Sequence, residues 1–296
     1  MGTELDTPAL SYLAFMVDRL HRVPYAQTFD PSAPGSLLFH LAIGRTVGYG
    51  ETAFGVVNLA WLTALSVVTW RLMRQLGPQI ASAASALVAL GYLQHGRDMS
   101  LQRDYVAILP ITLACLLAAH PERGRTLWRA TGVGLLFGLV ATIKPQLAIG
   151  LPIVVVFLLA GHRSVATSDR AERIRPARNH FVTALGAFAC PVAAALGWIA
   201  YVGGWRAFVS YYTEYLPLYL HLDAQHHALV GNERLAYLAY GVLSLGGLWL
   251  WVLPAALGAY AGIVRDGLAG PGRRLAWLLR DGDGLCSRAS AIRTVF

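Results

Sequence analysis

The sequence predicts an all-α fold, a polytopic membrane protein in which about seven helices span the bilayer. Of its 296 residues, 56% are hydrophobic and only 14% are charged, and the mean hydropathy is +0.50. A soluble domain of this size needs far more charged surface. The apolar runs are too long and too continuous for the strands of a membrane barrel, so helices are the predicted spanning elements.

Seven apolar segments approach or exceed the length of roughly 17–25 residues that a spanning helix needs. They cover residues 53–74, 79–94, 105–119, 127–143, 146–161, 180–203 and 235–264. Glycine and proline separate several of them, as at Gly77-Pro78 and Gly203-Gly204. Lys144-Pro145 interrupts the fourth and fifth segments.

Basic residues alternate between the loops that join these segments. One set of loops, with the C-terminal tail, holds sixteen basic residues against six acidic ones, and the other set holds eight against ten. Such an alternation is the pattern that the positive-inside rule predicts. It places residues 1–52, 95–104, 144–145 and 204–234 on the outer face and the C-terminus in the cytoplasm. The net charge of +8 therefore reflects topology, and nucleic acid is not a predicted partner.

Three parts follow from this topology. They are an external segment 1–52, a transmembrane domain 53–264 with an external aromatic loop at 204–234, and a cytoplasmic tail 265–296. The protein is therefore predicted to be a multi-pass protein of the cell membrane.

The external segment is expected to contain two short helices rather than a span. Thr7-Pro8 is typical of a helix start, and apolar residues then recur with helical spacing as far as Leu20. A second helix is expected over roughly Ser36 to Val47, and a proline-punctuated loop separates the two. Both helices are predicted to lie along the outer membrane surface.

Lys144 is the only lysine of the chain, and it lies between two predicted spans. An ionisable group in such a place suggests a functional role, because burying its charge costs several kcal/mol. At the outer end of a span it could bind a phosphate as a point charge. The alternative is a structural lysine that extends to the interface.

Three carboxylates of the external face have two interpretations each. Asp104 begins the third span, where it either caps the helix with Arg103 as a local partner or faces the same external cavity as Asp6. Glu4 and Asp6 precede the first short helix. They are either solvated residues of a terminus or a general base or metal-binding group at the bilayer surface.

Other residues exclude several kinds of site. The loop 204–234 is rich in aromatic residues, which fit an interfacial belt or a lid that binds a sugar or a lipid. His226-His227 has no metal-ligand partner spacing, and the three cysteines lie too far apart for a disulfide framework. Phosphate-binding loops, nucleotide fingerprints and hydrolase motifs are absent from the sequence.

The order of features along the chain resembles a known class of membrane enzymes. An acidic residue, an amphipathic helix and the element Val23-Pro24-Tyr25 precede a second short helix, and Gln102-Arg103-Asp104 and the run from Gly134 to Pro145 follow later. This order resembles the polytopic GT-C glycosyltransferases, which include protein mannosyltransferases (family 39) and lipid A aminoarabinose transferases. The resemblance covers most of residues 4–235.

The resemblance implies an inverting glycosyltransferase with a polyprenyl-phosphate sugar as donor and a lipid, glycan or protein as acceptor, outside the cytoplasmic membrane. Asp6 matches the catalytic acidic position of the first external loop, where it would deprotonate or orient the acceptor hydroxyl. Asp104 matches the second acidic position, and Lys144 matches a basic site near the leaving phosphate. Arg103 and Tyr25 are assigned to substrate binding with Lys144.

The chain also departs from that class. The family usually shows an Asp-Glu pair, whereas here Thr7 follows Asp6 and Glu4 precedes it, so Glu4 is a second catalytic candidate. A first spanning helix and further C-terminal spans are expected but missing, so the chain is predicted to be a fragment. The cofactor is unknown, with a divalent cation as one alternative.

Two other functions compete with the glycosyltransferase. A transporter or lipid flippase would use Lys144 and Asp104 as charges on a pathway, although no internal repeat is visible. A catalytically inactive scaffold is the third interpretation.

Overall fold

The computed structural model describes residues 6–28, 32–74, 77–95, 100–119, 126–162, 170–219, 231–236 and 239. Within these residues the regular structure is helical, and the only extended pairing is an isolated bridge between Pro24 and Thr28. The prediction of an all-α fold is confirmed for this part of the chain.

The helices follow the order of the apolar segments. They are α1 (Asp6–Arg19), α2 (Pro34–Thr46), α3 (Glu51–Met73), α4 (Pro78–His95), α5 (Arg103–Ala119), α6 (Thr126–Ile143), α7 (Leu151–His162), α8 (Arg170–Tyr201), α9 (Trp205–Ser210) and α10 (Leu216–Tyr219). A 3-10 helix over Pro145–Gly150 precedes α7, and a π-helix over Tyr211–Tyr215 joins α9 to α10.

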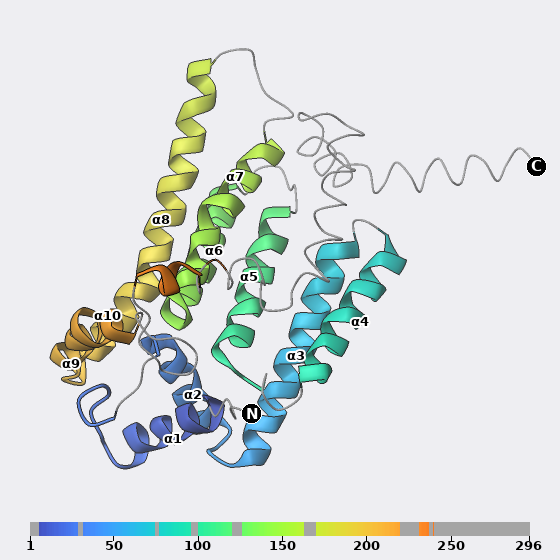
Figure 1. Ribbon diagram of the computed structural model, residues 1–296. Coiled ribbons are helices and arrows are strands. Elements are labelled where there is room, and N and C mark those ends of the chain that lie inside the picture. Colours follow the sequence, from blue (N-terminus) through green and yellow to red (C-terminus); the bar gives the residue numbers. More distant parts are fainter. Residues whose placement is uncertain are drawn as a thin grey trace, which may run out of the picture.

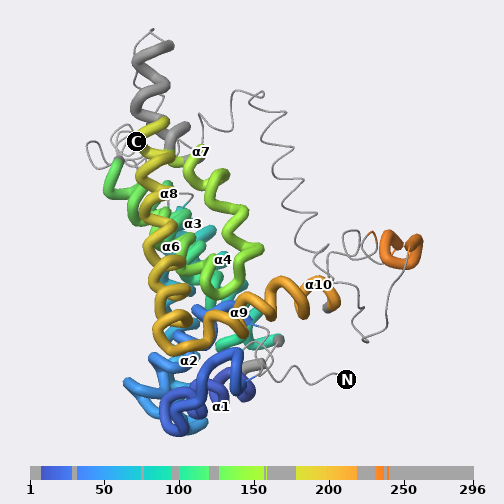
Figure 2. The backbone as a smooth tube through the Cα atoms, turned by 90° about the vertical axis from the view of Figure 1, so that its left-hand side faces the viewer, coloured from blue at the N-terminus to red at the C-terminus, as the bar shows by residue number. Residues whose placement is uncertain are grey.

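Helices α3 to α8 run alternately up and down, and α1, α2 and α9 lie at one end of this bundle (Figure 1). A second view places the same three helices at that end, with α10 extending away from the bundle (Figure 2). The start of α5 and the end of α6 therefore open toward α1 and α2. These are segments that the charge pattern predicts to share one face.

Three segments differ from the predicted elements, and one of them is α8, which begins at Arg170, ten residues before the predicted span 180–203. The span expected over 146–161 is divided into the 3-10 helix and α7. The division begins at Lys144, which is extended (φ −145°, ψ 91°) because the following proline disfavours the helical conformation. The first half of the predicted aromatic loop is helical, since α9, the π-helix and α10 follow one another without a break.

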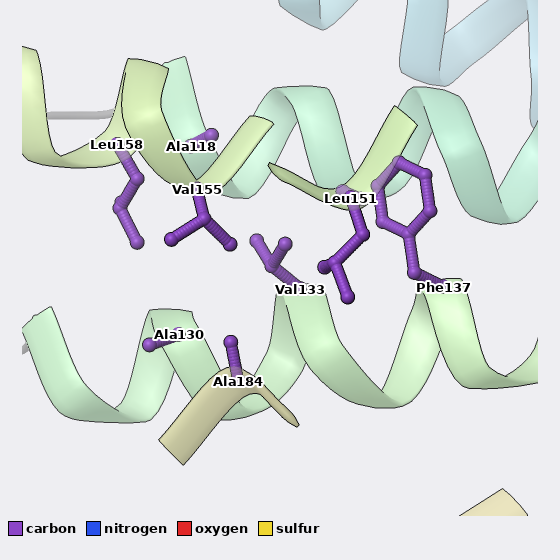
Figure 3. Packing of buried hydrophobic residues seen from close by; sticks show 9 residues of the cluster. Ala118, Ala130, Val133, Phe137, Leu151, Val155, Leu158 and Ala184 are labelled. Atoms are coloured by element: carbon purple, nitrogen blue, oxygen red, sulfur yellow. The ribbon is translucent and has the colours of Figure 1, made fainter. Parts of the chain in front are cut away.

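The main hydrophobic cluster packs α6 against α5, α7 and α8. Val133 and Phe137 on α6 point toward Leu151 and Val155 on α7, and all four are at most 5% exposed (Figure 3). Burying side chains of this size stabilises a fold by about 1.5–3 kcal/mol each. This cluster holds the lower end of α6, and therefore Lys144, in a defined place.

Helices α1 and α2 are joined by an apolar strip and by a polar network. Ala14 of α1 packs against Leu37 and Leu41 of α2. Arg45 Nε donates a 2.7 Å hydrogen bond to Asp18 Oδ1, and this bond holds the pKa of Asp18 below its ordinary value. The two short helices thus form one layer across the end of the bundle.

Two helical segments are long and apolar enough to cross a membrane, among the residues described: Glu51–Met73 and Arg178–Tyr201. Only 17% of the apolar window of each is buried within the protein, so most of these residues are half-buried or exposed. Leu127–Ile143 and Pro145–Val156 are shorter apolar helices. The predicted segment 235–264 lies almost wholly outside the described residues.

Candidate functional site

An ion pair between α5 and α6 lies at the centre of the candidate site. The Lys144 ammonium donates a hydrogen bond to Asp104 Oδ1. The side chains of Lys144 and Asp104 are 35% and 46% exposed, so the pair is accessible to a ligand. The structure therefore brings together two residues that the sequence singles out separately.

Local structure explains where these two side chains are placed. Lys144 ends α6, its backbone N–H still donating to the carbonyl of Val140 at 2.7 Å, and Pro145 redirects the chain. Asp104 lies in the first turn of α5, where the helix dipole stabilises a negative charge. The end of one helix and the start of another thus present opposite charges.

Ser32 connects two further predicted residues, Tyr25 and Arg103, and Arg103 directly precedes Asp104 in the chain. Arg103 Nη1 donates to Ser32 Oγ at 3.2 Å, and Tyr25 Oη donates to the Ser32 carbonyl at 2.7 Å. Ser32 itself is 3% exposed, and both of these hydrogen bonds are partly buried. These five residues, Tyr25, Ser32, Arg103, Asp104 and Lys144, are called the Lys144–Asp104 cluster below.

The start of α2 contacts the end of α6, directly before Lys144. Ser36 Oγ donates to the carbonyl of Ile143 at 3.1 Å, directly before Lys144. Gly35 approaches Thr142 so closely that a Cβ on Gly35 would overlap the threonine side chain and backbone. Only glycine permits this contact, because any side chain would push α2 away from α6.

His40 is buried on the other side of this contact. Its Nδ1 donates to the Ser36 carbonyl at 2.9 Å, and its ring stacks on Phe54 with a centroid separation of 5.8 Å. The side chain is 1% exposed, and this burial lowers the pKa of His40 to about 4. His40 is therefore neutral at physiological pH, and within the described residues its Nε2 has no hydrogen-bond partner.

Two residues that border the site have left-handed backbone conformations. Tyr25 has φ 63° and Leu101 has φ 53°. Such conformations in residues other than glycine cost roughly 1–3 kcal/mol and concentrate at functional sites. Tyr25 belongs to the cluster, and Leu101 lies three residues before Asp104.

The aromatic segment after α8 reaches the cluster through Tyr25. The Tyr25 ring packs edge-on against Phe208, with centroids 5.2 Å apart, and lies 6.5 Å from Tyr211. Gly204 lies against the carbonyl of Pro24, where a Cβ would come within 2.7 Å of the oxygen. Part of the predicted aromatic loop therefore covers the side of the site, and the π-helix at Tyr211 is a feature often found at functional sites.

A cavity of about 700 Å³ lies at the same end of the bundle, between α1, the start of α3 and the segment before α5. Its walls include the rings of Tyr12, Phe15, Tyr49 and Phe54, together with the carboxylate of Glu51. Ser11, Pro8, Gly55, Ser100 and Leu101 complete the lining. It is called the α1–α3 cavity below, and none of these lining residues is basic.

The remaining predicted site residues are described only in part. Asp6 is the first residue of α1, two residues before Pro8 of the cavity wall, and its side chain lies outside what the structure describes. Glu4 lies outside the described residues, as do His226 and His227 of the predicted aromatic loop.

Two residues of the site were not predicted. Ser32 lies in a proline-punctuated loop that the sequence marks only as rigid. Glu51 follows Gly50 at the start of α3, where an acidic residue is common at any helix start. Neither carries a sequence signal of its own.

The described residues do not form a resident metal site. Asp104 is already paired with Lys144, and within the described ranges no three His, Cys, Asp or Glu residues lie close enough together to bind one ion. Cys115 and Cys190 are free thiols there.

Comparison with known proteins yields no relative. No protein-family model matches the chain, no curated protein matches it, and no solved structure matches it.

Proposed function

We propose that this chain is a membrane glycosyltransferase of the GT-C type, which moves a sugar from a polyprenyl-phosphate donor to an acceptor on the outer face of the cytoplasmic membrane. The observation that supports it most is the Lys144–Asp104 cluster. In it, Lys144 is paired with Asp104, while Tyr25 and Arg103, the residue before Asp104, both donate hydrogen bonds to Ser32.

Outward-facing apolar surface supports a place in the membrane. Within the window of each long apolar helix, 17% is buried, whereas the core helix of a soluble protein would be mostly buried. Leu59 of α3, Ile153 of α7 and Val182 of α8 are at least 60% exposed. Lipid would cover these side chains, and about seven spans, including 235–264, are proposed.

The cluster carries the charges that a phosphate leaving group requires. Lys144 and Arg103 supply two positive charges and Asp104 one negative charge, so the cluster has a net positive charge. A donor phosphate would compete with Asp104 for the Lys144 ammonium and accept hydrogen bonds from Arg103. Both cations would then stabilise the negative charge that develops as the bond from the anomeric carbon to the phosphate oxygen breaks.

The acceptor would approach from the α1–α3 cavity. Asp6 begins the helix whose residues Pro8 and Ser11 line this cavity, and Leu101 on its far side is close in sequence to Asp104. The Asp6 carboxylate would take the proton of the acceptor hydroxyl while that oxygen bonds to the anomeric carbon with inversion. The polyprenyl phosphate would leave as the anion held by Lys144.

The test uses membranes that contain the protein and a radiolabelled polyprenyl-phosphate sugar. Lys144→Ala is expected to lower the transfer rate by roughly 10²–10³-fold, because a donor to the developing charge is lost. Asp6→Asn is expected to lower it by roughly 10²–10⁴-fold through loss of the base. Arg206→Ala, which removes an exposed basic residue on α9, is the matched control and should leave transfer unchanged.

The outcomes for the two variants test the roles of Asp6 and Lys144 separately. Transfer that survives Asp6→Asn overturns the assignment of the base, and transfer that survives Lys144→Ala overturns the assignment of the leaving-group site. Transfer that is absent from the unmodified protein with every donor overturns the glycosyltransferase itself.

A transporter or lipid flippase is the second candidate, favoured by the accessible ion pair between two helices. Proteoliposomes with a fluorescent polyprenyl phosphate distinguish the two functions. Movement of the lipid between leaflets, lost in Lys144→Ala and not accompanied by sugar transfer, would favour this candidate.

A further inference from the structure

We infer that the α1–α3 cavity binds the positively charged head group of an amphiphilic ligand. If the proposed function holds, on which this last step rests, that ligand is the acceptor. The inference is carried by three properties of the cavity: its aromatic walls, its carboxylate and its size.

The aromatic walls come from three different parts of the chain. Tyr12 and Phe15 belong to α1, Tyr49 to the turn after α2, and Phe54 to α3. Phe15 and Tyr49 meet edge to face, with centroids 5.5 Å apart. Aromatic faces attract a cation through their quadrupole, and rings gathered around one space are the usual way in which proteins bind an ammonium group.

Glu51 is the charged residue among the described lining residues of the cavity, and it makes no ion pair with any residue that the structure describes. It is the first residue of α3, where the helix dipole stabilises the carboxylate. A carboxylate in a cavity wall that also contains aromatic rings favours a cationic ligand and disfavours an anionic one.

The basic residues nearest to the cavity along α1 and α2 are already paired. Arg45 Nε lies 2.7 Å from an Asp18 oxygen, and Arg19 Nε lies 3.5 Å from the other. Asp18 offsets one of these two positive charges, and neither arginine is among the described lining residues of the cavity. The charge that the described lining residues contribute to the cavity is therefore negative and comes from Glu51.

The size and lining of the cavity indicate the rest of the ligand. Ligand pockets commonly measure about 300–1,000 Å³, and this cavity measures about 700 Å³. A mostly apolar lining suits an alkyl or aromatic body next to the charged group. The two charge signs are also separated, because the Lys144–Asp104 cluster has a net positive charge, so an anionic donor and a cationic acceptor would not exchange places.

The experiment compares three water-soluble probes with the same six-carbon chain: hexyltrimethylammonium, hexyl glucoside and hexyl phosphate. Binding to the full chain in lipid nanodiscs is measured by titration calorimetry without any donor. Hexyltrimethylammonium is expected to bind most tightly, and Glu51→Gln to weaken it by about fivefold. Glu214→Gln, an exposed carboxylate at the same end of the bundle, is the matched control and should not change the affinity.

A second pair of variants tests the aromatic walls. Tyr12 is 61% exposed, so its replacement is not expected to unfold the protein. Tyr12→Leu should weaken binding of the ammonium probe, whereas Tyr12→Phe keeps the ring and should retain it. Unchanged binding in both Glu51→Gln and Tyr12→Leu would overturn the inference, as would hexyl glucoside or hexyl phosphate binding as tightly as the ammonium.

The transfer assay tests the proposed function, and the binding assay tests the cation site separately. Loss of sugar transfer with intact ammonium binding overturns the proposed function but leaves the cation site. Intact transfer with no ammonium binding overturns the cation site alone.

Discussion

Ser32 shows how one buried residue unites a site that the sequence presents in separate pieces. Its hydroxyl accepts from Arg103 and its carbonyl accepts from Tyr25, two residues far apart in the chain. Lys144, in contrast, is recognisable from the sequence because it is the only lysine and lies between apolar segments. An unusual residue type can be recognised in the sequence, whereas a serine that connects two distant segments cannot.

At the same scale, His40 makes the stability of the fold depend on pH. Its pKa is lowered from 6.5 to about 4 in the folded protein, so the unfolded chain binds the proton more tightly. The contribution of neutral His40 to the free energy of unfolding is fully present above pH 6.5 and is lost as the pH falls toward 4. We expect a loss of about 3 kcal/mol in the free energy of unfolding over this range.

Chemical unfolding in nanodiscs, followed by circular dichroism, measures this dependence. His40→Gln keeps a donor for the Ser36 carbonyl but cannot titrate, so its stability should change little between pH 6.5 and 4. Asp18 provides an internal reference, since its pKa lies below its ordinary value of 3.8 and its contribution is lost only at lower pH. Identical pH profiles for the two proteins would contradict the role of His40.

At the scale of elements, two glycines bring α6 into close contact with α8. A Cβ on Gly134 would overlap the carbonyl oxygen of Ala184, and one on Gly138 would overlap that of Phe188. Glycines four residues apart are typical of close helix packing in membranes. This contact places the end of α6, and with it Lys144, against the rest of the bundle.

Gly138→Ala is expected to destabilise the protein by roughly 1–3 kcal/mol, because the added methyl group meets backbone rather than a movable side chain. The measurement is the thermal unfolding midpoint in nanodiscs. Gly186→Ala on α8 is the control, since a Cβ there has nothing within 4 Å, and it should be neutral or slightly stabilising. Equal shifts for both variants would contradict a tight α6–α8 contact.

At the scale of the whole molecule, the candidate site lies entirely at one end of the bundle. Helices α1, α2 and α9 lie there, together with the start of α5 and the end of α6 (Figure 1). Arg71 and Arg74 occupy the end of α3, at the opposite end of the bundle. The positive-inside rule predicts that the site faces outward.

Cysteine labelling in intact cells tests this orientation. In a background without native cysteines, Leu20→Cys marks the end that carries the site, and Gln79→Cys marks the opposite end; both positions are exposed. A membrane-impermeant maleimide should label the first position in intact cells and the second only after permeabilisation. The reverse pattern would contradict the predicted topology and an external site.

The sequence by itself determined the helical class, the order of the helices and the charge alternation. Each follows from local properties: the length of an apolar run, a proline after Lys144, and the placing of arginines between runs. It also singled out Lys144, Asp104, Arg103 and Tyr25 one by one. It did not predict that the first half of the aromatic segment 204–234 is helical, because aromatic composition does not decide between an interfacial helix and a loop.

Only the tertiary structure decided which of these residues meet. The Lys144–Asp104 pair, the role of Ser32 and the α1–α3 cavity depend on contacts between segments far apart in the chain, and such contacts leave no local pattern. The close approaches at Gly35 and Gly138 also depend on such distant contacts, because the need for a glycine is apparent only from the backbone packed against it. Packing, rather than composition, therefore brought single residues together into a site.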